Sequence, residues 1–172
     1  MPEIKEGSFT LDLGIVKLSK KLTEDDRQCA WELYTEIATR VAAVGKRMDH
    51  TAEDFSGELY AESLTSLYNL FQECRGIMRK FPVGKIKEGN QEHLGVLISR
   101  ILADVIRPFL EKWNGRFRAW WVSASQKQGS PFDVQDEFPE LKAFRKDWRD
   151  LRRMMRKVEH KLRDEYKLVP LD

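Results

Sequence analysis

The chain contains only two cysteines among 172 residues and no motif typical of a catalytic or metal site. Patterns of the GxSxG, Walker A, GxGxxG, CxxC and HExxH types are all missing from it. Its three histidines, His50, His93 and His160, lack the i, i+4 spacing that places two metal ligands on one helix face. The sequence therefore predicts no metal, no cofactor and no enzymatic activity.

Long apolar runs are also missing, and the N-terminus lacks the basic-then-apolar order of a signal peptide. We therefore expect a cytoplasmic protein that does not enter a membrane. Apolar residues make up 41% of the chain and charged residues 34%, which is typical of a folded globular domain. Cys29 and Cys74 each fall on the apolar face of an expected helix, which favours buried free thiols over a disulfide.

Apolar residues recur at helical spacing in four segments. The stretch from His93 to Trp121 has the widest apolar stripe, so it should contact at least two other helices. Residues 58–80 and 139–166 each carry a four-three apolar seam typical of helix bundles, and residues 23–44 form the fourth helix. The predicted fold is all-α, a four-helix-type bundle over residues 23–172 that follows an extended or β-like arm at residues 1–22.

Glycine and proline mark the expected interruptions of these helices. Gly45 suits a helix stop with positive φ, and Asn114-Gly115 should end or break the third helix. Pro108 should kink that helix and leave the Asp104 carbonyl without its usual donor. Gly76, inside the second helix, suggests close approach of another backbone.

Three segments between the helices are expected to be loops. Residues 46–57 form a polar connector whose Phe55 could tuck into the core, and residues 83–92 form an exposed loop. Residues 122–138 have no periodicity, and a loop of that length is usually functional or mobile. Its Phe132, Val134 and Phe138 could hold it to the core or present a docking surface.

The N-terminal arm shows two-residue periodicity over residues 8–18, which is typical of a short strand, with a phase shift at Gly14. An isolated hairpin is marginally stable in water, so the arm needs support. It should lie in a groove of its own domain, and the alternative is pairing with a strand of another chain.

Positive charge is concentrated in the last helix. Residues 140–167 carry 11 Lys and Arg against 6 Asp and Glu, so that segment is +5 in a chain of net charge +2. At 100° per residue Arg145, Arg149, Arg152 and Arg156 fall in one stripe. The stripe could bind a protein partner, follow nucleic-acid phosphates, or pair with acids of the first two helices. Those acids are Glu32, Glu36, Glu62 and Glu73.

Tryptophan is frequent, with five residues in a small domain, and tryptophan and arginine are enriched at binding hot spots. Trp120 and Trp121 stand beside the aromatic-bearing segment 122–138. The interaction surface predicted from the sequence therefore consists of Arg145, Arg149, Arg152 and Arg156 with Trp120, Trp121 and Phe132. A protein partner or a second copy of the chain is the leading hypothesis, and nucleic acid is the alternative.

Four segments carry a family resemblance: residues 22–41, 62–71, 105–113 and the Arg-rich 148–166. Their order resembles an uncharacterised bacterial family of small all-helical proteins, most specifically at Arg107-Pro108-Phe109-Leu110 and Lys112-Trp113. Asn114-Gly115 stands where that family would have a His-Pro pair. The resemblance implies a helical, prokaryotic subunit of a multicomponent assembly, associated with antiphage defence, and it brings no catalytic residues. We thus expect a non-enzymatic adaptor or accessory subunit.

Overall fold

The computed structural model describes residues 3–6, 9–12, 24–81 and 94–171. Its long elements are all helices, so the predicted all-α, four-helix-type fold is confirmed. The elements run along the chain as β1 (Glu3–Glu6), β2 (Phe9–Asp12), α1 (Glu24–Ala38), α2 (Val41–Val44), α3 (Tyr60–Lys80), α4 (Leu94–Arg100), the π-helix η1 (Ile101–Ile106), α5 (Arg107–Ala124), α6 (Pro131–Gln135) and α7 (Leu141–Tyr166).

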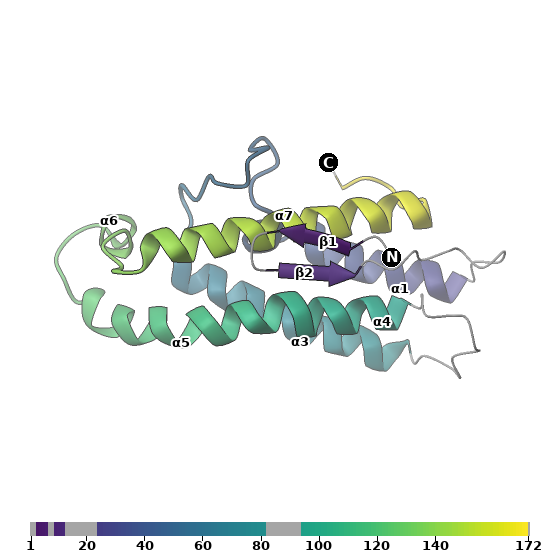
Figure 1. Cartoon of the computed structure of the whole chain (residues 1–172), viewed down its shortest axis with the longest axis horizontal. Coiled ribbons are helices and arrows are strands. Elements are labelled where there is room, and N and C mark those ends of the chain that lie inside the picture. The colour runs from purple at the N-terminus through teal and green to yellow at the C-terminus, as the bar shows by residue number, and fades with distance from the viewer. Residues whose placement is uncertain (1–2, 7–8, 13–23, 82–93, 172) are drawn as a thin grey trace.

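The bundle consists of four long helical segments, which we call columns and number along the chain: α1, α3, the segment from α4 to α5, and α7. Figure 1 shows how they lie together. The third column is built from α4, η1 and α5 in succession. Helix α1 contacts α3 and α7, and α5 contacts the same two helices from the other side. Each column therefore has two neighbours, as the wide apolar stripe of the third segment required.

The core is rich in aromatic side chains that come from three columns. Its central residues Tyr60, Phe109, Trp113, Phe144 and Trp148 are almost completely buried. Phe144 and Trp148 have ring centroids 5.0 Å apart, and Trp113 and Phe144 are 5.3 Å apart. The Trp113 indole donates to Asp147 at 3.0 Å and that of Trp148 to the Ala42 carbonyl at 2.8 Å, so both buried N–H groups are satisfied.

The apolar seams of the second and fourth segments face this core. Leu64, Leu67 and Cys74 of α3 are buried, as are Leu151, Met155 and Val158 of α7, as their spacing predicted. Gly45 has φ +73°, which agrees with the predicted helix stop. Phe55 of the connector is buried in the core, as expected.

The proline of the third column is accommodated by a π-helix. Residues Ile101–Ile106 form η1, in which the Arg107 N–H donates to the Leu102 carbonyl five residues back. Pro108 then lies in the first turn of α5, where a missing N–H is tolerated. The wider turn thus separates the proline ring from the regular helix that precedes it.

Several boundaries predicted from the sequence are wrong. Helix α5 runs through Asn114-Gly115 without a break as far as Ala124, and the segment after it contains helix α6. The first helix is interrupted at Thr39-Arg40, between α1 and α2. Among the described residues, no atom outside its own helix backbone lies within 4 Å of a Cβ built on Gly76, so the predicted close approach is not found there. The predicted loop 83–92 lies outside the described residues.

The N-terminal hairpin packs on its own chain. Strands β1 and β2 pair antiparallel with Glu6 opposite Phe9, and β1 contacts α7 while β2 contacts η1 and α7. The hairpin lies between α7 and the third column (Figure 1). Glu6 binds Lys157 at 2.8 Å and Arg153 at 3.5 Å. The arm thus docks on its own domain, while the expected bend at Gly14 lies outside the described residues.

Candidate interaction surface

The arginine stripe of α7 faces residues 45–59, the whole segment between α2 and α3, which we call the connector from here on and which protrudes from the side of the bundle (Figure 1). Arg152 is completely buried, and its Nη2 donates to both carboxylate oxygens of Glu58, at 2.7 and 2.6 Å. Its guanidinium also lies 4.2 Å from the centroid of the Phe55 ring. Burial lowers the pKa of Arg152, and the Glu58 carboxylate opposes that shift.

Arg156 holds the start of the connector through backbone atoms alone. It donates to the carbonyl oxygens of Val44, of Lys46 at 2.9 Å and of Asp49 at 2.7 Å. These carbonyls lie at the end of the short helix α2 and beyond it, where backbone acceptors lack helical donors. Arg156 therefore fixes the path of the chain as it leaves the bundle.

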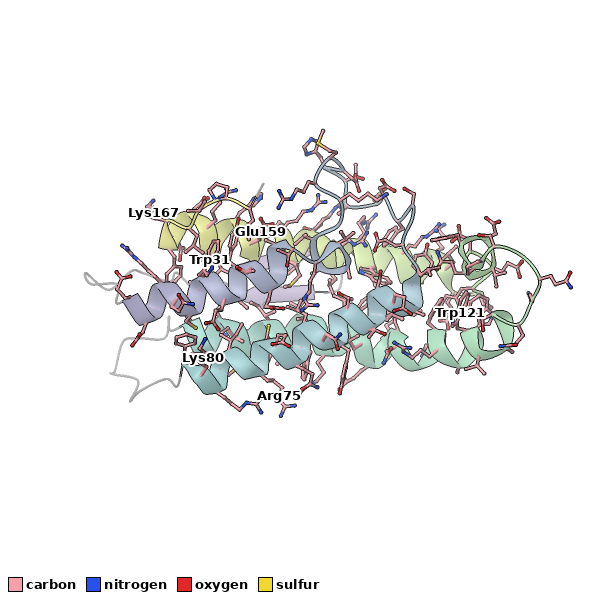
Figure 2. The ribbon with its side chains drawn as sticks, turned by 180° about the vertical axis from the view of Figure 1, so that it is seen from behind. Trp31, Arg75, Lys80, Trp121, Glu159 and Lys167 are labelled. Atoms are coloured by element: carbon pink, nitrogen blue, oxygen red, sulfur yellow. The ribbon has the colours of Figure 1, made fainter. Side chains whose placement is uncertain are left out.

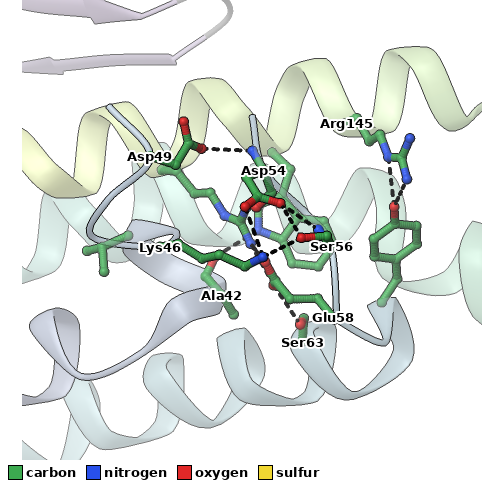
Figure 3. A network of polar contacts seen from close by, with 12 residues as sticks. Ala42, Lys46, Asp49, Asp54, Ser56, Glu58, Ser63 and Arg145 are labelled. Atoms are coloured by element: carbon green, nitrogen blue, oxygen red, sulfur yellow. Dashed lines mark hydrogen bonds and ion pairs between the residues drawn. The ribbon is translucent and has the colours of Figure 1, made fainter. Parts of the chain in front are cut away.

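The other two arginines of the stripe are partly exposed, and each of them binds at least one acid. Arg149 pairs with Glu53 of the connector at 3.0 Å and with its neighbour Asp150 at 2.9 Å. Arg145 donates to the Tyr60 hydroxyl at 2.7 Å (Figure 3), and it also pairs with Asp136 at 2.6 Å. Burial raises the pKa of Tyr60 to about 12 despite the nearby Arg145. All four arginines thus have partners inside the fold.

These partners differ from the acids that the sequence suggested. Glu32 binds Lys80 and Glu36 binds Arg40, so both belong to the α1 side of the bundle. The residues that do pair with the stripe, Glu53 and Glu58, lie in the connector. Their role was missed because nearly a hundred residues separate them from α7. The only local signal was the number of acids in that short polar segment.

The connector also has its own hydrogen-bonded turns (Figure 3). The Asp49 carboxylate accepts from the backbone N–H groups of Thr51 at 2.9 Å and Asp54 at 2.8 Å. Hydrogen bonds, first from the Thr51 hydroxyl, hold the pKa of Asp49 well below its ordinary value. Asp54 accepts from Ser56 and pairs with Lys46 at 2.9 Å, and its pKa falls to about 2. Asx turns and ion pairs therefore give this polar segment a defined shape.

The two adjacent tryptophans lie together at the end of the bundle formed by α5 and α6. Trp120 and Trp121 have ring centroids 6.0 Å apart. Trp120 contacts Phe138 at 5.2 Å, and Trp121 stacks on the buried Phe117 at 5.7 Å. Both indoles are partly buried, and Figure 2 shows Trp121 between α5 and the α6 region. The structure thus gives each indole one packed face and leaves part of it open to solvent.

Phe132 of α6 is 44% exposed and lines a hollow whose walls do not include the two tryptophans. That hollow, which we call the α6 hollow, measures about 550 Å³ and is also lined by Phe55, Asp136 and Arg145. The structure therefore brings Phe132 and Arg145 to one concave surface. Arg152 takes no part in that surface, because its side chain has no solvent exposure.

Gln135 is a structural residue that the sequence did not reveal. Its side-chain oxygen accepts from the Tyr60 N–H at 2.9 Å, and its amide donates to the Glu58 carbonyl at 2.7 Å. A residue of α6 thus satisfies backbone groups at the start of α3, which links the α6 region to the connector. No propensity or spacing rule could have identified a pairing across 75 residues.

Within the described residues, no group of three or more His, Cys, Asp or Glu is placed to hold a metal ion. None of the described helices combines the length and the apolar content needed to cross a lipid bilayer. Comparison with known proteins found no matching family model, no matching curated protein and no matching solved structure.

Proposed function

We propose that this chain is a non-enzymatic protein-interaction subunit whose contact surface is the end of the bundle formed by α5 and α6. The observation that carries the proposal is the apolar surface there. Val122 of α5 is 71% exposed and Phe132 of α6 is 44% exposed, and the partly open indoles of Trp120 and Trp121 belong to the same end of the bundle. Large aromatic side chains with one packed face and one open face are typical of binding hot spots.

The arginine pairings weigh against nucleic acid as the ligand of this chain. Phosphate binding needs guanidinium groups that can exchange their counterions for phosphates. The guanidinium of Arg152 already binds Glu58 in the interior, and that of Arg149 binds two carboxylates. Using either for phosphate would break an existing ion pair, so a protein partner is the better-supported ligand.

The family resemblance adds a biological process to the proposal. The chain would act in a bacterial multicomponent assembly that serves antiphage defence. No residue contact bears on that setting, so it depends on the identity of the partner. Affinity capture of the tagged chain from its host, followed by mass spectrometry, would name that partner. Its own motifs would then indicate the process.

The surface is tested by a matched pair of substitutions. Val122→Glu adds a charge at the proposed surface, and Val169→Glu adds the same charge at a valine of similar exposure, 69%, after α7. We expect Val122→Glu to remove the captured partner and Val169→Glu to retain it, with helical circular dichroism unchanged in both. Equal capture by the two variants would reject this surface. A partner that disappears on nuclease treatment would make nucleic acid the working ligand.

A further inference from the structure

Three exposed arginines form a row on the outer side of α3. Arg75 and Arg79 are about one helical turn apart, and Arg75 follows Phe71 at the same spacing, so the three residues lie on one side of the helix. The guanidinium of Arg107, from α5, lies 5.7 Å from the centroid of the Phe71 ring. We call Arg107, Arg75 and Arg79 the α3 row. Its positions along α3 are separated by about 6 Å.

The charges of the α3 row are not neutralised inside the fold. Arg75 donates to the uncharged side-chain oxygen of Gln72 at 3.5 Å, and Arg107 contacts the uncharged ring of Phe71. Among the described residues no carboxylate pairs with any of the three arginines, and the side chain of Arg79 has no hydrogen-bond partner. Figure 2 shows Arg75 directed away from the bundle. Unlike the arginine stripe of α7, the α3 row can therefore bind an anion without breaking an ion pair.

The acids of α3 lie on the other side of the helix. At 100° per residue, Glu62 and Glu73 are about 140° and 160° from Arg75 around the helix axis. Both glutamates instead line hollows that α3 shares with residues of α1. No acid of α3 therefore stands beside Arg75 and Arg79, and the positive charge of these two residues faces solvent.

An exposed aromatic side chain adjoins the α3 row. Tyr68 is 49% exposed and precedes Phe71 by three residues, so it lies on the same side of α3. Tyrosine and arginine are both enriched at protein interfaces and among their hot spots. The combination of guanidinium groups with an open tyrosine ring favours a protein ligand that has both acidic and apolar side chains.

Two acids of the third column limit the kind of anion that fits. Asp104 precedes Arg107 by three residues and Glu111 follows it by four, and both are exposed. In the described part of the chain neither acid forms an ion pair. They would repel a nucleic-acid strand that extends past Arg107, because such a strand carries a phosphate at every nucleotide. A short cluster of acids, which ends at Arg107, is the better match.

We propose that the α3 row binds a short acidic segment of a partner protein. Glutamate or aspartate side chains of the segment pair with Arg75, Arg79 and Arg107, and an apolar side chain contacts Tyr68. The acids extend over about 12 Å, the distance along α3 from Phe71 to Arg79. This surface belongs to α3, so it is independent of the α5–α6 end and goes beyond the function proposed for that end.

The test uses a short fluorescein-labelled peptide of glutamate and leucine, with binding followed by fluorescence anisotropy. We expect Arg75→Glu and Arg79→Glu each to weaken binding about tenfold, as loss of a close charge pair does. Lys142→Glu makes the same charge change at an exposed lysine of α7, and it should alter binding less than about twofold. Because Arg75 and Arg79 form no ion pair with the described residues, helical circular dichroism should be unchanged in all three variants.

The specificity of the α3 row is tested with two further probes. The same peptide with lysine in place of glutamate should bind the double variant Arg75→Glu/Arg79→Glu more tightly than the unsubstituted chain. Single-stranded DNA should bind the unsubstituted chain more weakly than the acidic peptide does. The proposal is overturned if the acidic peptide fails to bind, if Lys142→Glu weakens its binding as much as Arg75→Glu, or if the lysine peptide does not prefer the double variant. It is also overturned if DNA binds more tightly than the acidic peptide and loses that binding in the double variant.

Discussion

The buried ion pair between Arg152 and Glu58 allows a sharp test of how the connector is held. Glu58→Gln keeps the shape of the side chain but removes the charge opposite a guanidinium with no solvent exposure. Removing one partner of a buried pair costs about 3–5 kcal/mol, because the remaining charge stays in the interior without compensation. At this chain length each kcal/mol lowers Tm by about 2–4 °C, so the expected decrease is roughly 6–20 °C.

The measurement is urea unfolding followed by circular dichroism, with calorimetry for Tm. Glu53→Gln is the matched control, because Glu53 makes the same kind of ion pair with Arg149 at an exposed position, and it should cost less than about 1 kcal/mol. The double variant Glu58→Gln/Arg152→Met should recover most of the loss, since no buried charge remains. Equal losses for Glu58→Gln and Glu53→Gln would refute the reasoning, as would a double variant no more stable than Glu58→Gln.

Three further predictions concern the connector and the two buried cysteines. Gly45→Ala should lower the free energy of unfolding, measured in urea, by about 1–3 kcal/mol. The backbone at φ +73° and ψ −174° suits glycine alone, and the added Cβ would lie 3.0 Å from Arg156 Nη2. An unchanged free energy of unfolding would contradict this prediction. The pKa of Asp49 is lower in the folded state than in the unfolded state. Its contribution to the free energy of unfolding is therefore fully present above the unfolded-state pKa and is lost as the pH falls through the folded-state pKa. Asp49→Asn should therefore reduce the slope with which the free energy of unfolding falls at acid pH, and an unchanged slope would be evidence against this. Burial raises the pKa of Cys29 and of Cys74 to about 12, so a thiol reagent at pH 8 should label them only as fast as the protein unfolds, and immediate labelling would show open thiols.

The helices themselves followed from local patterns in the sequence. The apolar seams at residues 60–80 and 141–166 repeat with the spacing of helices in a bundle. A helix with such a stripe has few ways to pack other than with the stripe against other helices. Gly45 was identifiable because a positive φ has a steric requirement that depends on one residue. By contrast, Asn114-Gly115 was expected to break a helix, and it does not. Packing of Phe109, Trp113 and Phe117 in the core outweighs the weak helix propensity of those two residues.

The candidate surfaces were predictable only in part. The amino-acid sequence alone showed that four arginines of α7 share one stripe and that two tryptophans adjoin an aromatic segment. The tertiary structure decided that Arg152 is internal, that Arg156 holds carbonyls of the connector, and that Phe132 and Arg145 line the same hollow. Helical periodicity fixes the direction of a side chain relative to its own helix axis. What that side chain meets depends on which distant segment packs there, and for the arginine stripe that segment lies about a hundred residues earlier in the chain.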